Sequence, residues 1–366
     1  MRSKTPRFAA GPEMSMQSAK TQPFAPEPSS PDDLLETGLP NLWYLIARSE
    51  DVDVRPVALK RLDRNIVLWR GEKGEINVVE DYCPHRGAPL SMGEVINGNL
   101  ACAYHGVQVT GQGIVADVPP TPNCPLVGQK AIRSYPCREL AGAIWAYFGD
   151  EAHAQAPEPI FPEEITSNEW TGFLITKTWQ CNWQVALDNR ADPVHGSFLH
   201  AGTFTLGRGR KDTELKIVPT PNGFETSRDN QRGVNIDWHE VFFRPENIFW
   251  VRTEIPYPES IGGGSFRIVG LPTPIDRDST YFWVYRSRKL SGWQRNLWRF
   301  LYKNRLGQRS DSVLEQDRVM LEAIPLEARQ REKLLQVDIA IARLRRMVKA
   351  EATRQFETRK QPAAAE

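Results

Sequence analysis

Two histidines and an aspartate lie close together near the middle of the chain, at Asp192, His195 and His200. Imidazole and carboxylate groups are ligands for a hard-to-borderline divalent metal that keeps open coordination positions. Asp192 and His195 are three residues apart and would share one face of a helix. His195 and His200 would diverge by roughly 140° at the usual helical repeat, so the helix must widen or break if both bind one metal. Gly196 and Ser197 favour such a break; otherwise the two histidines are unrelated, one capping a helix and one in the core.

Four further metal-ligand side chains form two pairs earlier in the chain: Cys83, His85, Cys102 and His105. Between the pairs, Asn97-Gly98 separates two β-rich runs and is a strong signal for a type I′ hairpin. That hairpin would bring the two pairs together at neighbouring loop tips. Two thiolates and two imidazoles could hold zinc, but zinc sites more often pair Cys-x2-Cys with a matching pair. The mixed spacing better suits an iron–sulfur cluster with two cysteines on one iron and two histidines on the other.

Together the two groups resemble the metal motifs of the Rieske non-haem iron oxygenases, specifically the terminal oxygenase component (the alpha subunit of the ring-hydroxylating oxygenases). Cys83-x-His85-x16-Cys102-x2-His105 is similar to the Rieske cluster motif, and Asp192-x2-His195-x4-His200 is similar to the iron motif of the oxygenases. The resemblance covers about residues 39–350. It implies that the first four residues hold a [2Fe-2S] cluster and that His195 and His200 hold catalytic Fe(II). The chain departs from the family after the second cluster histidine, where Val107-Gln108-Val109 replaces the usual aromatic pair.

A third iron ligand is expected to be a carboxylate, because two histidines and one carboxylate leave one face of the iron free. Ser312 and Glu315 form a capping-box pattern and Pro325 ends the run, which predicts a helix near residues 312–324. Asp317 falls on the apolar stripe of that helix. A carboxylate in such a place is costly unless it is paired or bound to metal.

Asp317 is therefore the predicted third ligand, and the triplet Glu315-Gln316-Asp317 is similar to the neighbourhood of the family's late aspartate. Glu322 is the weaker rival because it leans away from the stripe. A salt bridge to Arg318 or to a nearby arginine is the alternative role for Asp317.

The elements that must position these residues form two successive β-rich regions. Short β-rich runs come first, and longer ones that suit an antiparallel meander follow. The predicted fold class is α+β: an all-β Rieske [2Fe-2S] domain followed by an antiparallel-sheet catalytic domain, for which the resemblance implies a helix-grip, START-like form. The predicted order is a disordered N-terminal segment, the Rieske domain, a proline-rich linker, the catalytic mononuclear iron domain and a disordered tail: residues 1–38, 39–150, 151–160, 161–350 and 351–366.

Two further features of the second region concern the substrate and the surface. Seven aromatic residues could line a substrate cavity, although the core of a sheet is the commoner place for them: Phe242, Phe243, Trp250, Phe266, Tyr281, Trp283 and Tyr285. His239 alternates with apolar residues and is expected to be a structural side chain rather than a ligand. The segment Ser291–Gly307 mixes aromatic and leucine residues with arginine and lysine, which predicts an amphipathic basic helix. Such a helix could touch a membrane surface, but covering a pocket mouth or packing at a subunit contact is favoured.

Composition and charge exclude several classes of protein. The net charge is +1 with 25% charged residues, so there is no electrostatic case for nucleic-acid binding. No run approaches the roughly 18 apolar residues that a membrane span requires. No GxGxxG or other nucleotide fingerprint is present, so electrons from NAD(P)H must arrive through another protein. Five cysteines in a chain without an apolar signal core indicate metal ligands or free thiols, and a cytoplasmic location.

The resemblance implies an enzyme, a Rieske non-haem iron mono- or dioxygenase, that takes electrons from a separate reductase or ferredoxin and activates O2 at Fe(II). Its substrate would be an apolar compound, aromatic or polycyclic, as in aromatic compound catabolism; monohydroxylation, dihydroxylation and oxidative demethylation stay open. The resemblance further implies a homotrimer, with a β subunit left open, in which Asp192 joins His195 of one subunit to His105 of the next. Two alternatives remain: a zinc- or cluster-containing ligand-binding protein on the same scaffold, and an electron carrier without oxygenase activity.

Overall fold

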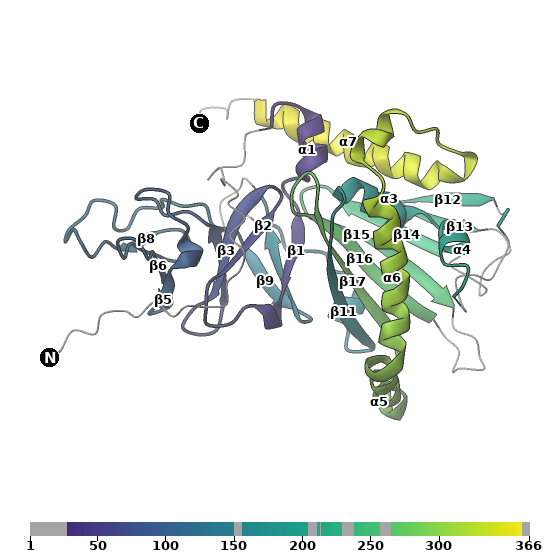
Figure 1. Ribbon diagram of the computed structural model, residues 1–366, viewed down its shortest axis with the longest axis horizontal. Coiled ribbons are helices and arrows are strands. Elements are labelled where there is room, and N and C mark those ends of the chain that lie inside the picture. The colour runs from purple at the N-terminus through teal and green to yellow at the C-terminus, as the bar shows by residue number, and fades with distance from the viewer. Residues whose placement is uncertain are drawn as a thin grey trace.

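The computed structural model describes residues 28–149, 156–203, 211–212, 214–228, 238–256 and 265–360. Figure 1 shows a smaller β-rich body beside a broad sheet that is accompanied by helices. We refer to these bodies as the N-terminal and C-terminal domains. The N-terminal domain is all-β and the C-terminal domain combines helices with a sheet, as the sequence predicts.

Short antiparallel strands build the N-terminal domain: β1 (Trp43–Arg48), β2 (Val57–Arg61), β3 (Arg64–Arg70), β4 (Ile76–Glu80), β5 (Glu94–Ile96), β6 (Asn99–Ala101), β7 (Gln108–Val109), β8 (Val115–Asp117), β9 (Cys137–Leu140) and β10 (Ala143–Tyr147). β2, β3 and β4 form one sheet, and β5 to β8 form a second sheet of shorter strands. Between β5 and β6, Asn97 and Gly98 both have positive φ, at 50° and 76°. A type I′ turn requires these values, so the predicted hairpin is confirmed.

The C-terminal domain is built on one antiparallel run of strands: β11 (Trp170–Trp179), β12 (Leu215–Thr220), β13 (Gly223–Arg228), β14 (Trp238–Arg244), β15 (Ile248–Pro256), β16 (Ser265–Pro274) and β17 (Thr280–Lys289). Their order across the sheet is β12, β13, β14, β15, β16, β17 and β11. At β15 the sheet continues into the N-terminal domain, because Trp43 of β1 pairs in parallel with Ile248. One sheet therefore joins the two domains, which the sequence patterns did not predict.

Helices position the candidate site against this sheet: α1 (Pro31–Thr37), α2 (Glu163–Thr166), α3 (Trp183–Ala191), α4 (Gly196–Leu199), α5 (Gly292–Leu301), α6 (Gly307–Glu322) and α7 (Ile339–Lys360). In Figure 1, α6 crosses in front of the sheet and α7 runs along its upper edge. Val185 of α3 and Leu314 of α6 share one apolar cluster with Phe282 and Val284 of β17. Helix α6, which carries Asp317, and helix α3, whose end leads into the segment of His195 and His200, are thus held together through the same strand.

The opposite face of β17 packs on the N-terminal domain. Neighbouring residues of a strand face opposite sides, so Trp283 and Tyr285 point away from Phe282 and the helices. The Trp283 ring lies 5.1 Å from the Trp145 ring, measured between centroids, and the Tyr285 hydroxyl donates to the Ala141 carbonyl at 3.0 Å. Of the two roles considered for these aromatic residues, a place in the core is the one observed for Trp283 and Tyr285, between the domains.

The predicted disorder at the two ends is wrong where the structure describes them. Ser30 forms a capping box at the start of α1, and Leu34 of that helix is buried in the main core. At the other end α7 continues to Lys360, and Gln355 donates to the Pro40 carbonyl at 3.0 Å. Disorder was predicted at these ends from their polar and charged composition. That inference fails here because a few apolar residues suffice to bury one face of a helix. Residues 1–27 and 361–366, in which disorder was also predicted, lie outside the described residues.

The helix that carries Asp317 begins earlier than predicted. A π-helical turn, Tyr302–Leu306, connects α5 to α6, which starts at Gly307. Ser312 therefore lies inside the helix and forms no N-terminal cap, because the chain is already helical when it reaches this residue. The predicted end is confirmed, since α6 stops at Glu322, shortly before the proline. Among the described helices, none is both long and apolar enough to cross a bilayer.

Candidate metal centres

The two histidines of the central motif flank a short helix rather than a widened one. α3 ends before Asp192, whose backbone is extended, and Pro193 follows. A residue that precedes proline is disfavoured in the helical conformation, so the break falls there. His195 then precedes α4 and His200 follows it. The predicted break at Gly196-Ser197 is wrong, because those residues form the first turn of α4.

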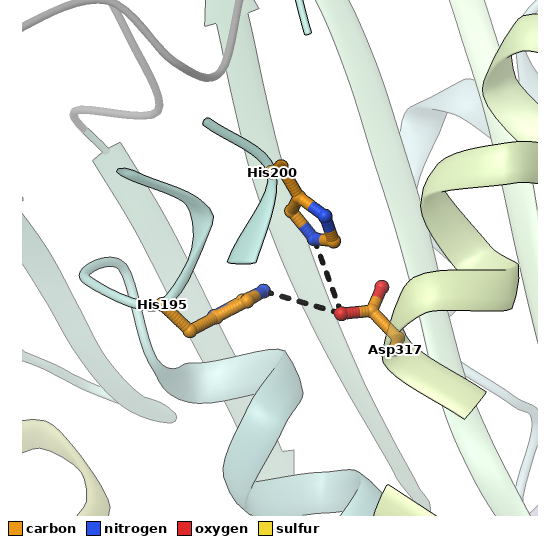
Figure 2. Close-up of side chains that lie close together, drawn as sticks. All are labelled: His195, His200 and Asp317. Atoms are coloured by element: carbon orange, nitrogen blue, oxygen red, sulfur yellow. Dashed lines mark ion pairs between the residues drawn. The ribbon is translucent and has the colours of Figure 1, made fainter. Parts of the chain in front are cut away.

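Asp317 approaches both histidines from α6, as Figure 2 shows. Its Oδ1 atom lies 3.6 Å from His195 Nε2 and 3.1 Å from His200 Nε2. The three ligand atoms all lie within 4.8 Å of one another. Ligands bound at about 2.1 Å and at right angles to each other are about 3 Å apart, so one metal ion fits between these atoms. Asp317 and His200 are buried, at 6% and 1% exposure.

The other ring nitrogen of each histidine has an acceptor that fixes the tautomer. His195 Nδ1 lies 2.8 Å from the backbone oxygen of Asp192, and His200 Nδ1 lies 2.8 Å from Gln316 Oε1. Because both partners are acceptors, each Nδ1 carries the proton and donates, which leaves the Nε2 lone pairs free for a metal. Asn189 Nδ2 donates to Asp317 Oδ1 at 3.3 Å. The sequence analysis missed the roles of Gln316 and Asn189, although Gln316 stands next to the predicted ligand.

Electrostatics around His200 favour a positive charge at this place. Burial lowers the pKa of His200, but the hydrogen bonds and the charge of Asp317, together with the Gln316 hydrogen bond, outweigh it. The net result is a pKa above the ordinary value of histidine. A buried carboxylate facing two imidazoles therefore requires a proton or a metal ion for balance.

Asp192 acts on this site through two different groups of atoms. Its backbone oxygen orients His195, whereas its carboxylate Oδ1 accepts the Val194 backbone N–H at 2.7 Å. Carboxylate Oδ2 lies 3.7 Å from His195 Nδ1, beyond hydrogen-bond distance. Within one chain, the predicted hydrogen bond from His195 to the Asp192 carboxylate is therefore replaced by one to the main chain.

The four residues of the earlier motif lie on two loops with the same backbone pattern. Cys83 N–H donates to the Ala88 carbonyl at 2.8 Å, and Cys102 N–H donates to the Val107 carbonyl at 2.9 Å. In each loop the glycine four residues after the cysteine has positive φ, 75° at Gly87 and 72° at Gly106. This conformation is cheap only for glycine. The shared spacing of cysteine and glycine in the sequence thus encodes two matching loops.

These loops bring together the residue types of a mixed-ligand cluster. Cys83 and Cys102 are buried at 2% and 3% exposure, while the rings of His85 and His105 lie outside them, 4.6 Å apart between centroids. Burial raises the pKa of the Cys83 thiol to about 11, although the backbone N–H of His85 opposes the rise. A metal bound there must stabilise the thiolate. Cysteines inside and histidines outside fit a [2Fe-2S] cluster with two imidazole ligands.

Two family matches cover most of the chain. Residues 42–136 match the Rieske [2Fe-2S] domain, and residues 179–354 match the vanillate O-demethylase oxygenase C-terminal domain. The chain belongs to the Rieske oxygenases. Among its curated relatives, the vanillate O-demethylase oxygenase subunit of Pseudomonas sp. (strain HR199 / DSM 7063) is 33% identical over 181 residues, 49% of each chain. The 4β-methylsterol monooxygenase of Methylococcus capsulatus is 34% identical over 169 residues, 44% of each chain.

Solved structures agree with this family over nearly the whole fold. Dicamba monooxygenase bound to dicamba gives a TM-score of 0.67 at 22% identity, covering 87% of this chain and 98% of the other. The terminal oxygenase of carbazole 1,9a-dioxygenase from Novosphingobium sp. KA1 gives 0.69 at 18% identity, covering 87% and 95%. At these identities the likeness establishes the fold alone, and it confirms the predicted fold class. The aligned part spans about half the length of the curated relatives described above.

Within this Rieske oxygenase the departure after His105 has a structural consequence. Val107 and Val109, which stand where the family commonly has aromatic residues, are both buried in the small core of the N-terminal domain. An aromatic ring instead precedes the histidine, since the Tyr104 and His105 ring centroids are 3.9 Å apart. Tyr104 is 58% exposed. The histidine side of the site is therefore covered by an exposed ring rather than by a buried pair.

The interior of the C-terminal domain beside the candidate iron ligands is polar and cationic. Arg190 of α3 reaches Thr253 Oγ1 and the Val251 carbonyl, each at 3.4 Å, and burial lowers its pKa to about 10. Burial, with the charges of Arg190, His195 and Arg228, lowers the pKa of His239 well below its ordinary value. His239 is thus neutral, and it lies outside the one cluster of three metal-ligand groups found among the described residues. These observations agree with its predicted structural role.

A pocket of about 580 Å³ opens beside Asp192 and His195. Residues of α3, α4, α6 and α7 line it, including Phe198, Met320 and Arg345. Phe198 and Met320 are 55% and 48% exposed. The outward side of the candidate iron site is therefore accessible to another molecule and is partly apolar.

Proposed function

We propose that this chain is the terminal oxygenase component of a Rieske oxygenase system, which hydroxylates or oxidatively demethylates an apolar organic substrate. The observation that carries the proposal is the convergence of two imidazole nitrogens and a carboxylate oxygen within 4.8 Å, in a chain that also has a Rieske domain. An electron carrier would not need this second set of ligands. A ligand-binding protein would not need the cluster loops.

Each candidate residue has a role in this proposal. Four of them hold the [2Fe-2S] cluster: Cys83, His85, Cys102 and His105. His195, His200 and Asp317 hold Fe(II), with one face left open. The cluster supplies single electrons and the iron supplies activation of O2. Gln316 and Asn189 keep the ligand atoms pointed at one place, because they bond the His200 ring and the Asp317 carboxylate.

The electron path is proposed to cross between subunits. In Figure 1 the sheet of β5 to β8 and helix α4 lie at opposite ends of the molecule. The pocket beside Asp192 and His195 opens outward. In a homotrimer the neighbouring subunit's His105 could approach the Asp192 carboxylate there, which would make Asp192 the bridge between the centres, because its backbone oxygen already bonds His195 Nδ1; a β subunit stays open. Electrons would come from a reductase or ferredoxin, and an oxygenase of carbazole 1,9a-dioxygenase has been solved in complex with its ferredoxin.

The substrate is proposed to be aromatic or polycyclic. By their names, relatives of this chain act on vanillate, on 3-chlorobenzoate and on a 4β-methylsterol. These compounds share an apolar ring system, and monohydroxylation, dihydroxylation and demethylation all use the same iron ligands. A cytoplasmic location is supported by the cysteines, none of which forms a disulfide in the described part of the chain.

The proposal is tested on iron-replete protein combined with a reductase, a ferredoxin and a panel of aromatic and polycyclic compounds. We expect a red-brown protein whose reduced form has the rhombic EPR signal of an imidazole-ligated cluster. We also expect O2 uptake that depends on one class of compound, with the oxygenated product identified by mass spectrometry. A colourless protein with stoichiometric zinc would refute the cluster assignment. A normal cluster with no mononuclear iron and no substrate-coupled O2 uptake would refute the oxygenase proposal and identify the chain as an electron carrier.

A further inference from the structure

Helix α5 is fixed to the sheet by one face and projects from the molecule. Trp298 and Tyr302, four residues apart, are buried at 4% and 6% exposure. The Tyr302 ring stacks on the Phe173 ring of β11, with centroids 4.2 Å apart and planes 9° apart. In Figure 1, α5 extends below the sheet at the lower end of α6. Its position is therefore set by one aromatic contact face.

The face turned away from the sheet is also apolar. Four large side chains on it are exposed: Trp293 (72%), Leu297 (46%), Phe300 (64%) and Leu301 (38%). Their spacing of four, three and one residues places them on one stripe of a helix. Soluble monomers expose single apolar residues routinely, but a contiguous stripe of this kind marks a binding surface.

Basic residues accompany the stripe without acidic ones. The segment from 289 to 309 has six arginines and lysines and no aspartate or glutamate. Lys289 pairs with Glu169, and Arg295 donates to the carbonyls of Leu290 and Asn168. Within the described residues no ion pair involves three of the others: Arg299, Lys303 and Arg305. Their positive charge is therefore available to a partner.

We propose that α5 is a peripheral membrane-binding helix that lies in the headgroup region of an anionic bilayer. A tryptophan, a phenylalanine and two leucines on one stripe, flanked by arginine and lysine, match the chemistry of that interface. The tryptophan suits the boundary between headgroups and acyl chains. The unpaired cations match anionic lipids, whose surface potential attracts basic segments. An acidic protein partner would use the cations but would not need four exposed apolar side chains. This inference rests on the surface of α5 and does not depend on the oxygenase proposal.

The test uses the full-length, cluster-loaded protein and sedimentation with vesicles. One set of vesicles contains phosphatidylcholine alone, and the other contains equal parts of phosphatidylcholine and phosphatidylglycerol. We expect binding to the mixed vesicles that weakens as salt is raised. Trp293→Ser combined with Phe300→Ser should weaken this binding by about tenfold or more, because two large apolar side chains are withdrawn from the boundary with the acyl chains. Arg299→Glu combined with Lys303→Glu should abolish the preference for the anionic lipid.

Matched controls and competing outcomes decide the question. Val54→Ser and Leu335→Ser remove side chains that are exposed at 72% and 69% but lie away from α5, and they should leave vesicle binding unchanged. Equal losses in these controls, or undiminished binding in the α5 variants, would overturn the proposal. If the wild-type protein ignores vesicles, a change of oligomeric mass in the α5 variants would assign the stripe to a subunit contact. A raised KM for ferredoxin would instead assign it to the electron donor.

Discussion

Replacing Gln316 tests whether its side chain holds His200 in the metal-binding tautomer. His200 Nδ1 lies 2.8 Å from Gln316 Oε1, and the histidine is 1% exposed. Gln316→Leu fills the space of the amide without offering an acceptor, so a buried N–H is left unsatisfied. That loss costs about 1–3 kcal/mol. Removing such an outer partner typically weakens metal binding by about 10–100-fold, which agrees with this energy. We therefore expect Fe(II) affinity to fall by one to two orders of magnitude.

The assay is anaerobic Fe(II) titration of protein that keeps its cluster but has been stripped of mononuclear iron. Cluster absorption reports folding, and it should be the same in all variants. Gln316→Glu keeps an acceptor oxygen and should bind Fe(II) at least as tightly as the wild type. Glu315→Leu, one residue away and exposed, loses only its pairing with Arg318 and should also bind normally. Affinity within about twofold of wild type in Gln316→Leu, or an equal loss in Glu315→Leu, would refute the reasoning.

Three further results are expected from the contacts and the burial of other side chains. Asp317→Ala should keep the cluster spectrum but lose the mononuclear iron in metal analysis, whereas Glu322→Ala, which removes an acceptor of the Gln180 N–H, should retain the iron. Asp192→Asn keeps an acceptor for the Val194 N–H and leaves the backbone oxygen in place, so both metals should stay bound. Single-turnover product yield should nevertheless fall by orders of magnitude, and a near-normal yield would exclude the proposed electron bridge. Burial raises the pKa of the Cys137 thiol to about 11 and that of Cys181 to about 12, so alkylation at pH ~8 should reach them only on unfolding, as peptide mass spectrometry can show.

The sequence alone predicted those features of the structure that depend on the type of a residue and on its local spacing. The cluster loops are an example, because a cysteine with a glycine four residues later specifies the same turn twice. Asp317 is another, since a carboxylate at a core-facing position requires a partner wherever the helix begins. Its helix starts at Gly307 rather than at Ser312, yet the side of the helix that Asp317 occupies is unchanged. The apolar periodicity therefore predicts the buried side of a helix more reliably than local signals predict where the helix begins.

Contacts between distant segments could not be predicted in this way. Alternation along β17 separates Phe282 from Trp283, but nothing local indicates which of them faces the helices and which faces the N-terminal domain. The pairing of Trp43 with Ile248 joins segments that are far apart in the chain. The error at the central motif has a local cause instead. The sequence indicated a break near the histidines, but the position of that break follows from Pro193 and from the carboxylate of Asp192 bonding the Val194 N–H.

Helices α5 and α6 connect the exposed stripe to the proposed iron ligand Asp317 through one continuous helical path. Between them, Arg286 of β17 donates to the Tyr302 hydroxyl at 3.0 Å and to the Ser310 carbonyl at 2.8 Å. Arg286 is 3% exposed and bonds the chain on both sides of the π-helical turn. Because the path is anchored to the sheet at this point, a change on the outer face of α5 has no direct route to Asp317. Trp293→Ser with Phe300→Ser should therefore leave the mononuclear iron content unchanged, so a loss of vesicle binding in that variant reports on the surface alone. Loss of iron in the same variant would mean that the Arg286 contacts do not prevent a change on α5 from affecting Asp317.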